Sequence, residues 1–144
     1  MASVADLIKG KGKEVFSVSA TTSIREALLL MSGKDIGALP VMDGEKLAGI
    51  FSERDFARLL AHSGAFPLDT PMKEVMTKKV FTVTLSTKLE TCMQIMTEKH
   101  IRHLPVVEEE KMVGLITIGD VVKTIISSQK EFIKQLEGYI SGSW

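Results

Sequence analysis

The sequence predicts a mixed α/β (α+β) fold, in which two similar β-α-β-β-α units are followed by a C-terminal helix. The first observation is an internal repeat without gaps, because residues 13–55 recur as residues 78–120 and Pro40 corresponds to Pro105. The second is that strand-like and helix-like hydrophobic patterns follow one another in the same order in both copies. A unit of roughly 60 residues buries too little surface to be stable alone, so we expect the two units to fold together.

Each copy starts with a short run of β-forming residues, at 15–18 in the first copy and at 80–83 in the second. Apolar residues then recur at helical spacing, which predicts an amphipathic helix in both copies. Those on the apolar face are Ile24, Ala27, Leu28 and Met31 in the first copy and Leu89, Cys92, Met93 and Met96 in the second. Thr22 and Thr87 stand two residues before these faces, and we predict that their hydroxyls cap the helices.

Two strands and a second helix complete each copy. The predicted strands are 38–42 and 47–51 in the first copy and 103–107 and 112–117 in the second, and the helices are about 53–62 and 118–127. Asp43-Gly44 is a strong turn signal between the first pair of strands. Glu108-Glu109-Glu110 takes its place in the second pair, where we interpret it as a solvated turn.

These elements divide the chain into four parts. We predict a first repeat at 1–63, a linker at 64–71, a second repeat at 72–127, and a C-terminal helix and tail at 128–144. Pro67 and Pro71 interrupt helical patterns in the linker, and residues 72–76 suggest a short turn. The helical spacing of apolar residues at 129–140 predicts a separate amphipathic helix that packs on the body or on a partner subunit.

The composition disfavours several classes of function. Lys and Arg together number 18, as do Asp and Glu, so the net charge is zero and bulk electrostatic binding to nucleic acid or an acidic membrane is not expected. No apolar run is long enough to span a membrane, and the N-terminus lacks the pattern of a secretory signal. The single cysteine, Cys92, lies on a predicted apolar helix face, which favours a buried thiol over a reactive one. A reducing, cytoplasmic setting is therefore expected.

The strongest chemical motif is a strand that runs into a hydroxyl residue, with an aspartate three positions later. It occurs as Ser52 with Asp55 and again as Thr117 with Asp120. One interpretation is structural, because this spacing is typical of a helix cap. The other is a ligand site, because amides at a helix start bind anions and a carboxylate accepts the two hydroxyls of a ribose. The sequence leaves both interpretations open.

Basic residues near the two motifs differ. Arg54 lies inside the first motif, where the second has Gly119, and Arg102-His103 opens a strand where the first copy has Gly37-Ala38. A guanidinium suits a phosphate group, although Arg102-His103 is equally compatible with a charged edge strand. Two clefts built from these copies should therefore differ in electrostatic character.

The Leu-Pro-Val strand, the hairpin and the Gly-x-x-[Ser/Thr]-x-x-Asp motif, each present twice, resemble a tandem pair of CBS (cystathionine β-synthase) domains over residues 1–127. The tail at 138–144 is similar to that of stand-alone small CBS-pair proteins of bacteria and plant organelles. The resemblance implies two repeats packed sheet to sheet with pseudo-twofold symmetry, and two clefts that bind AMP, ADP, ATP, NAD(H) or S-adenosylmethionine. It also implies a homodimer in which four repeats form a disc.

The resemblance assigns roles to matching residues. Asp55 and Asp120 should hold ribose hydroxyls, and Ser52 and Thr117 should contact ribose or phosphate. Arg54, Arg102 and His103 should meet phosphate, and Gly119 of the second motif is also expected to contact the ligand. The residues expected to line the adenine pockets are Phe16, Ala38, Leu39, Pro40, Thr77, Phe81, His103, Leu104 and Pro105.

Other patterns are less informative. Residues 10–13, Gly-Lys-Gly-Lys, lack the spacing of a phosphate-binding loop, so we interpret them as a solvated loop near one predicted cleft. The histidines have no metal-ligand spacing, and no catalytic triad or pair is recognisable. The leading hypothesis is a non-catalytic sensor of adenine nucleotides that signals by conformational change to a partner. The alternatives are a ligand-free interaction or dimerisation module, an S-adenosylmethionine binder, an enzyme or a nucleic-acid binder.

Overall fold

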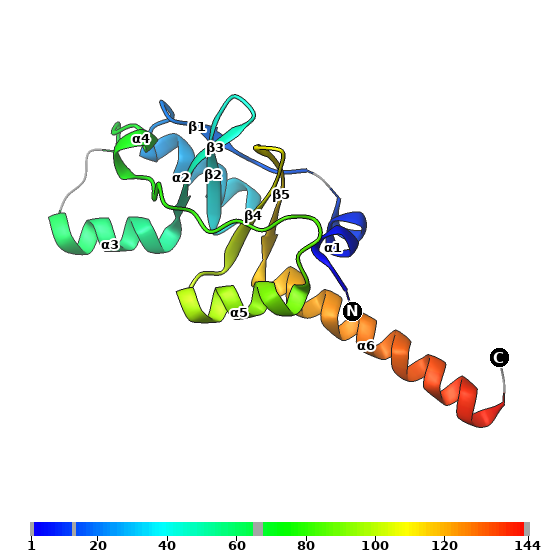
Figure 1. The fold of residues 1–144 in the computed structure, drawn as a ribbon. Coiled ribbons are helices and arrows are strands. Elements are labelled where there is room, and N and C mark those ends of the chain that lie inside the picture. The colour runs from blue at the N-terminus through cyan, green and yellow to red at the C-terminus, as the bar shows by residue number, and fades with distance from the viewer. Residues whose placement is uncertain (1, 13, 65–67, 143–144) are drawn as a thin grey trace. The chain divides into compact units, whose positions relative to one another are not determined.

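The computed structural model describes residues 2–12, 14–64 and 68–142 (Figure 1). The chain forms two compact units, and neither is continuous along the sequence. Unit 1 comprises residues 1–13, 82–108 and 113–144, and unit 2 comprises residues 14–81 and 109–112. Each unit combines helices with a small sheet, so the predicted mixed α/β fold with two similar halves is confirmed.

Unit 2 contains a three-stranded sheet in the order β1-β2-β3. The strand β1 (Val18–Ser19) is parallel to β2 (Ala38–Asp43), and β2 is antiparallel to β3 (Lys46–Ser52). Gly44, in the turn between β2 and β3, has a φ of 63°, a conformation that glycine adopts at no steric cost. The helices of this unit are α2 (Ile24–Lys34), α3 (Glu53–Ser63) and α4 (Met72–Val75).

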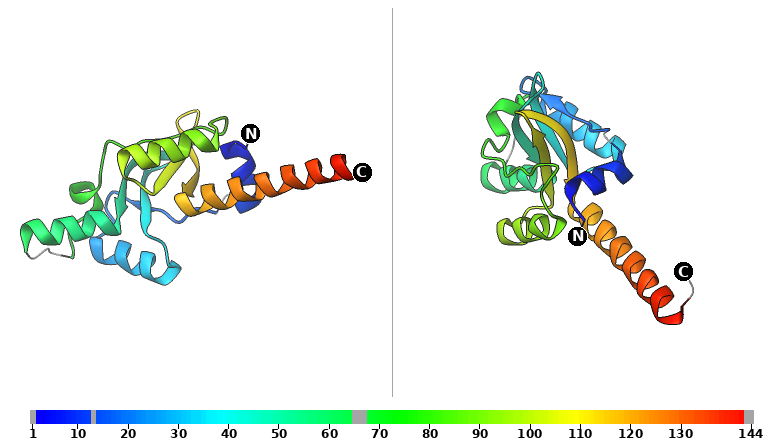
Figure 2. Two further views of the ribbon diagram at one scale, coloured as in Figure 1. Left: turned by 90° about the horizontal axis from the view of Figure 1, so that it is seen from below. Right: turned by 45° about the vertical axis from the view of Figure 1, so that its right-hand side comes forward.

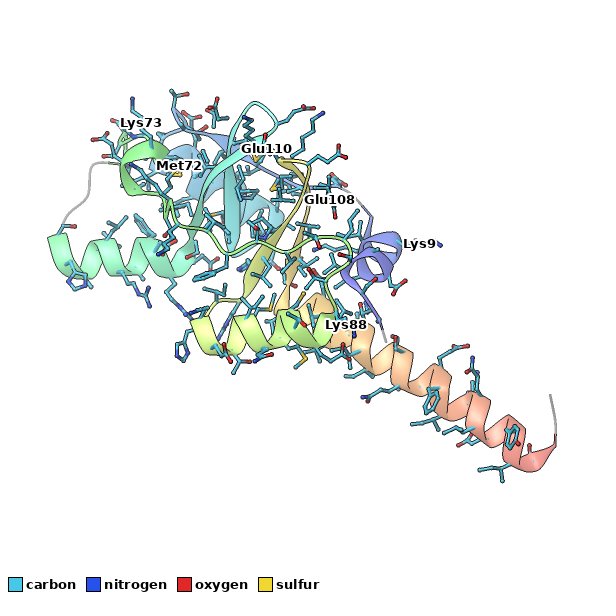
Figure 3. All side chains as sticks on the ribbon, in the orientation of Figure 1. Lys9, Met72, Lys73, Lys88, Glu108 and Glu110 are labelled. Carbon is cyan, nitrogen blue, oxygen red and sulfur yellow. The ribbon has the colours of Figure 1, made fainter. Side chains whose placement is uncertain are left out.

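The core of unit 2 lies where α2 and α4 meet the sheet. The predicted apolar face of α2 supplies Ile24, Ala27 and Met31, each at most 2% exposed. Strand residues complete the cluster, and Met72 of α4 joins it with no exposed surface (Figure 3). By contrast α3 buries none of its residues fully, and it packs on the core through the partly buried Phe56 and Leu59.

Unit 1 contains a two-stranded sheet made of β4 (His103–Glu108) and β5 (Lys111–Thr117). The first two residues of β5 belong to unit 2. The turn between these strands places Glu109 and Glu110 at positive φ values of 49° and 67°, so non-glycine residues make the tight turn that Gly44 makes between β2 and β3. The helices are α1 (Val4–Lys11), α5 (Leu89–Lys99) and α6 (Ile118–Ser141). The first two and the start of α6 enclose one hydrophobic cluster.

A short helical segment packs against each unit in the same way. In unit 1 the amide of Val4 donates to the carbonyl oxygen of Thr87 at 2.8 Å, just before α5, near Lys88 in Figure 3. In unit 2 the amide of Met72 donates to the carbonyl oxygen of Thr22 at 2.8 Å, just before α2. Thus α1, at the start of the first repeat, packs with the second repeat, and α4, at the start of the second repeat, packs with the first.

The first strands of the repeats are shorter than predicted. The run at 15–18 contributes only its last residue to β1, and the run at 80–83 forms no strand but a single bridge between Val83 and Val106. The strands of both hairpins occur where predicted, each extended by one or two residues. A first strand that pairs with its neighbour on one side only is held by few hydrogen bonds, which explains its short length.

The predicted helix caps were wrong. Ser23, and not Thr22, caps α2, because its Oγ accepts a hydrogen bond from the amide of Glu26 at 3.1 Å. The Thr22 hydroxyl instead accepts from the amide of Ser19 at 3.1 Å, and the Thr87 hydroxyl accepts from the amide of Thr84 at 3.0 Å. Both threonines therefore close the turn that precedes the helix, a competing use of the same hydroxyl chemistry.

The two helices predicted at 118–127 and 129–140 are one continuous helix, α6. The polar residues between the two apolar segments, Ser127, Ser128 and Gln129, interrupt the apolar face but not the backbone hydrogen bonds. None of them is proline or glycine, so nothing in this stretch ends a helix. No helix among the described residues is both long and apolar enough to cross a membrane.

Candidate functional site

In each unit the chain leaves a hairpin strand and enters a helix through a hydroxyl residue and an aspartate. In unit 2 the Ser52 hydroxyl accepts from the amide of Asp55 at 3.1 Å, and Asp55 Oδ2 accepts from the amide of Ser52 at 3.0 Å. In unit 1 Thr117 and Asp120 make the same two bonds at 3.1 and 3.0 Å. The cap interpretation is therefore confirmed at both corners, which we call the Asp55 corner and the Asp120 corner.

The capping hydrogen bonds leave acceptor capacity on both aspartate carboxylates. The cap bond falls on Oδ2 in both carboxylates, and a carboxylate has room for about four donors. All four corner side chains are half-buried, so they remain accessible from one side. The geometry therefore permits a carboxylate to hold its helix with one oxygen and accept ligand hydroxyls with the other.

A second backbone contact joins each corner to the preceding strand. The amide of Glu53 donates to the carbonyl oxygen of Gly37 at 3.0 Å, and the amide of Ile118 donates to that of Arg102 at 2.9 Å. Ala38 is also the sheet partner of Ser52. The structure thus brings the residues before β2 and β4 to the corners, as the two copies predicted.

Lys11 is the residue that distinguishes the Asp120 corner. It occupies the last turn of α1, and its Nζ lies 2.5 Å from Asp120 Oδ2 and 2.9 Å from the carbonyl oxygen of Leu115. The interpretation of residues 10–13 as a solvated loop was wrong for Lys11, because α1 continues to this residue and aims its side chain at the corner. Among the described residues, no Lys or Arg forms a matching ion pair with Asp55.

The charges at the Asp120 corner shift two pKa values. Partial burial alone would raise the pKa of Asp120, but hydrogen bonds from Lys11 and Thr117 outweigh it and hold the pKa below its usual value. Burial, followed by the charges of Lys11 and Arg102, lowers the pKa of His103, and the charge of Asp120 opposes this only in part. Near pH 7 the corner therefore combines a carboxylate, a neutral imidazole and two cations.

Beside the Asp55 corner, the backbone of Thr77 takes the place that Lys11 has in unit 1. Thr77 pairs with Ile50 through two backbone hydrogen bonds of 2.8 and 2.9 Å, next to the corner. This approach is close, because a Cβ added at Gly49 would lie 2.8 Å from the carbonyl oxygen of Thr77. Thr77, predicted as a site residue, therefore lies near Ser52, with an exposed side chain. Arg54 is exposed in the first turn of α3.

Several of the predicted lining residues have buried side chains. Leu39 and Leu104 belong to the hydrophobic clusters of their units, with no exposed surface. Ala38, Pro40 and Pro105 are also buried, whereas His103 is half-buried and Gly119 is exposed. Any contact that the buried residues make with a ligand would come from their backbones, and their role stays a prediction.

The two predicted aromatic residues lie in different surroundings. Phe16 packs on the core of unit 2, and the ammonium of Lys34 lies 5.0 Å from the centre of its ring. Phe81 is 40% exposed. Their assignment to a ligand pocket also stays a prediction, supported by the resemblance.

Lys11 was missed by the sequence reasoning, although the sequence contains a signal for it. Ser3 and Asp6 have the spacing of a capping box, which the structure confirms with a bond of 2.9 Å from the amide of Ser3 to Asp6 Oδ2. Val4, Leu7 and Ile8 then form an apolar helix face, and Lys11 is the next residue on it. A helix predicted from these residues would have pointed Lys11 toward the same surface that the apolar face covers.

The described residues contain no cluster of histidine, cysteine or acidic side chains able to hold a metal ion. The side chains at the two corners offer hydrogen bonds and charge. Each offers a hydroxyl, a carboxylate and a helix start, and only the Asp120 corner adds Lys11 and Arg102-His103.

Comparison with known proteins identifies the repeat. The family model of the CBS domain matches residues 4–62 and again residues 72–127. The chain belongs to the CBS-domain family. It is 33% identical to the CBS domain-containing protein CBSX3, mitochondrial, of Arabidopsis thaliana, over 98% of this chain and 73% of that protein. The predicted resemblance to a tandem CBS pair is therefore confirmed.

Solved structures agree with this assignment. A putative signal-transduction protein with CBS domains from Burkholderia ambifaria has a TM-score of 0.82 and 40% identity, covering 89% of this chain and 96% of that one. The structure of CBSX2 in complex with AMP has a TM-score of 0.75 and 27% identity, covering 90% of this chain and 99% of that one. The described CBS pair of this chain thus shares its fold with a protein whose structure contains AMP.

Proposed function

We propose that this CBS pair is a non-catalytic sensor that binds adenine nucleotides at the Asp55 and Asp120 corners and signals by a change of conformation. The observation that carries the proposal is that both corners pair a carboxylate with a hydroxyl at a helix start, in half-buried positions. This combination suits the two hydroxyls of a ribose and the oxygens of a phosphate. The AMP complex of the relative CBSX2 supports the choice of ligand.

The two corners are proposed to prefer different ligands. The Asp120 corner has Lys11, Arg102 and a half-buried histidine, so it should favour nucleotides with several phosphates, such as ATP or ADP. The same cations disfavour S-adenosylmethionine, whose sulfonium is positive. The Asp55 corner has Arg54 in its helix and the backbone of Thr77 beside it. AMP or NAD(H) suits this less cationic corner better.

The signal requires a partner that distinguishes the bound from the free state. We propose that the pair acts as a homodimer, following the family resemblance, and passes the signal to a protein of another kind. A ligand-free interaction module is the competing function. The exposed apolar face of α6 favours an interaction role, whereas a dedicated pair of half-buried carboxylates favours a ligand.

The test is calorimetric titration and thermal unfolding with AMP, ADP, ATP, NADH and S-adenosylmethionine, on the wild type and on Asp55→Asn and Asp120→Asn. Asparagine keeps an oxygen for the cap bond but removes the charge that strengthens bonds to ribose hydroxyls. We expect AMP or ATP to raise the Tm of the wild type. Each substitution should weaken one binding event roughly tenfold or more.

Asp6→Asn is the matched control. Asp6 completes the same kind of capping box with Ser3 in α1, but not at a strand-to-helix corner. It should leave every nucleotide titration unchanged. If no adenosine compound moves the Tm at millimolar concentration, or if Asp6→Asn weakens binding as much as the corner variants do, the proposed sensor function is contradicted.

A further inference from the structure

The C-terminal half of α6 presents apolar side chains that remain largely exposed among the described residues of unit 1. Near its start, Ile118, Val121 and Ile125 pack into the core of the unit. Beyond this point the helix extends away from the sheet and from α1 and α5 (Figures 1 and 2). Phe132 is 60% exposed, Ile133 52% and Ile140 82%. Single exposed apolar residues are common on proteins, but several large ones gathered on one side of a helix usually mark an interface.

These residues form a stripe with the spacing of a helix–helix seam. We call the α6 stripe the set Ile126, Phe132, Ile133, Leu136, Tyr139 and Ile140. Its members recur three, four and seven positions apart, which places them on one side of the helix. The stripe covers 15 residues, which corresponds to about 21 Å of helix.

A groove lies at the end of the stripe nearest the body of unit 1. It has a volume of about 610 Å³ and follows one face of α6, with Val122, Lys123, Ile126, Ser127 and Lys130 along it. The apolar side chains Val122 and Ile126 are 38% and 46% exposed. The groove is shallow, because all of its lining residues belong to α6, and it leaves Val122 and Ile126 accessible to whatever covers the stripe.

The charges beside the stripe indicate what covers it. On an ideal helix Lys130 and Glu137 lie on the same flank, because they are seven residues apart, while Ser128 and Gln135 on the other flank are uncharged. When two helices pack antiparallel, like flanks face each other, and when they pack parallel, unlike flanks do. An antiparallel pair would therefore set Lys130 against Glu137 twice, whereas a parallel pair would set both against uncharged residues.

We propose that the α6 stripe binds the α6 stripe of a second copy of this chain, antiparallel, with the twofold axis at Ile133. This register places Leu136 of the partner subunit two residues from the level of Phe132, and Glu137 of the partner subunit one residue from the level of Lys130, so both pairs meet diagonally. It also sets Ile126, at the groove, against Ile140 of the partner subunit. A single register thus brings apolar side chains together, sets opposite charges near each other and places Ile140 of the partner subunit at the groove. The same contacts occur twice, as a twofold interface requires.

The alternative occupants fit less well. A membrane surface would need a cationic flank, but Lys130 and Lys134 are balanced by Glu131 and Glu137. The proposal adds a surface and a direction to the proposed homodimer. Its test involves no nucleotide, so the two proposals can fail separately.

Disulfide cross-linking of the full chain tests the direction and the register. In a Cys92→Ala background, Ile133→Cys should cross-link to itself under mild oxidation, because both copies place this residue at the axis. Ile126→Cys should not, since seven residues on either side of the axis put the two thiols about 21 Å apart. A mixture of Ile126→Cys and Ile140→Cys chains should cross-link to each other. Equal self-linking at 126, 133 and 140 would indicate a parallel pair, and no linking at 133 would show that no such pair forms; either result overturns the proposal.

Charge reversal tests the flanks by sedimentation equilibrium. Lys130→Glu and Glu137→Lys should each weaken dimer formation roughly tenfold, because each change turns two symmetric attractions into repulsions. The double variant should restore the wild-type dimer constant, and Lys134→Glu, on the far side of the helix, is the matched control with no effect. Ile133→Glu should weaken the dimer more strongly than any charge reversal. A double variant no better than the singles, or an Ile133→Glu variant as dimeric as the wild type, would overturn the proposal.

Discussion

In unit 2 the carbonyl oxygen of Ile50 accepts a hydrogen bond from the backbone of Thr77, whereas in unit 1 the carbonyl oxygen of Leu115 accepts one from the side chain of Lys11. Ile50 and Leu115 are equivalent positions of the repeat, two residues before the hydroxyl that caps the helix. The corners themselves are alike, but their neighbours are a neutral backbone in one unit and an ammonium in the other. The repeated motif therefore fixes the geometry of each corner, and the segment packed beside it sets the charge.

The largest difference in stability between the two units should come from substituting the glycines that precede these carbonyls. At Gly49 an added Cβ would lie 2.8 Å from the Thr77 carbonyl oxygen, a backbone atom with little freedom to move. At Gly114 it would lie 2.8 Å from Cδ1 of Ile8, the end of a flexible side chain. We expect Gly49→Ala to cost about 2 to 3 kcal/mol of unfolding free energy and Gly114→Ala about 1 kcal/mol or less. Urea unfolding measures both, and equal losses would contradict the backbone contact in unit 2.

Removing the hydroxyl that caps the helix should cost the same unfolding free energy in both units. Ser52→Ala and Thr117→Ala each remove one hydroxyl that accepts from an aspartate amide at 3.1 Å. Each should lower the unfolding free energy by about 1 kcal/mol, the usual cost of losing a cap. A thermal or urea series on the two variants tests this equality. A Thr117→Ala cost that clearly exceeded the other would indicate that the Lys11 contact depends on the cap.

The ion pair of Lys11 should contribute little to stability. Both its side chain and that of Asp120 are partly exposed, at 34% and 27%, and such pairs contribute about 0.5 kcal/mol. Lys11→Met should therefore destabilise by about that amount at low salt and by nothing measurable at high salt. Lys9→Met is the control, because Lys9 is in the same helix turn but points away from unit 1 (Figure 3). A loss of several kcal/mol would show that Lys11 has a structural role beyond this pair.

The smallest effect is expected in the pH dependence of stability. The pKa of His103 is lowered in the folded protein, so the unfolded chain binds a proton more readily than the folded one. His103 therefore contributes stability that is complete above about pH 6.5 and is lost as the pH falls below that value. Asp120, also with a lowered pKa, contributes in the same direction at more acidic pH. The pKa of His103, measured by NMR titration, should rise in Lys11→Met, and an unchanged value would contradict the proximity of the two charges.

The sequence predicted the corners because they are local. A strand, a hydroxyl and an aspartate three residues later determine a capping box without help from distant residues, and this pattern occurs twice. The hairpins were predicted for the same reason, since turn residues and alternating side chains lie within a few positions of one another. The residues before β2 and β4 could also be placed near the corners, because the hairpin register carries them there.

The remaining features depend on contacts between distant segments. Lys11 lies 109 positions from Asp120, and no repeat or spacing relates them; only the helical face of α1 hints at the contact. The Thr22 and Thr87 hydroxyls were predicted to accept from a helix amide, but each accepts from an amide of the preceding turn. A turn and a helix cap both need a hydroxyl that accepts from a nearby backbone amide, so the residue type alone does not tell them apart. The continuity of α6 was missed because an apolar face was taken as the sign of a helix, whereas a helix also continues through polar residues.

The most direct test of the account is the affinity of the Asp120 corner for ATP and for adenosine, measured by calorimetry on Asp55→Asn with and without Lys11→Met. In the Asp55→Asn background binding at the Asp55 corner should be weakened, so that the Asp120 corner dominates the titration. We predict that Lys11→Met lowers the ratio of ATP affinity to adenosine affinity about tenfold, because it removes a cation that meets phosphate and not the nucleoside. Lys9→Met should leave the ratio unchanged. An unchanged ratio in Lys11→Met would contradict the claim that Lys11 makes the two corners different sites.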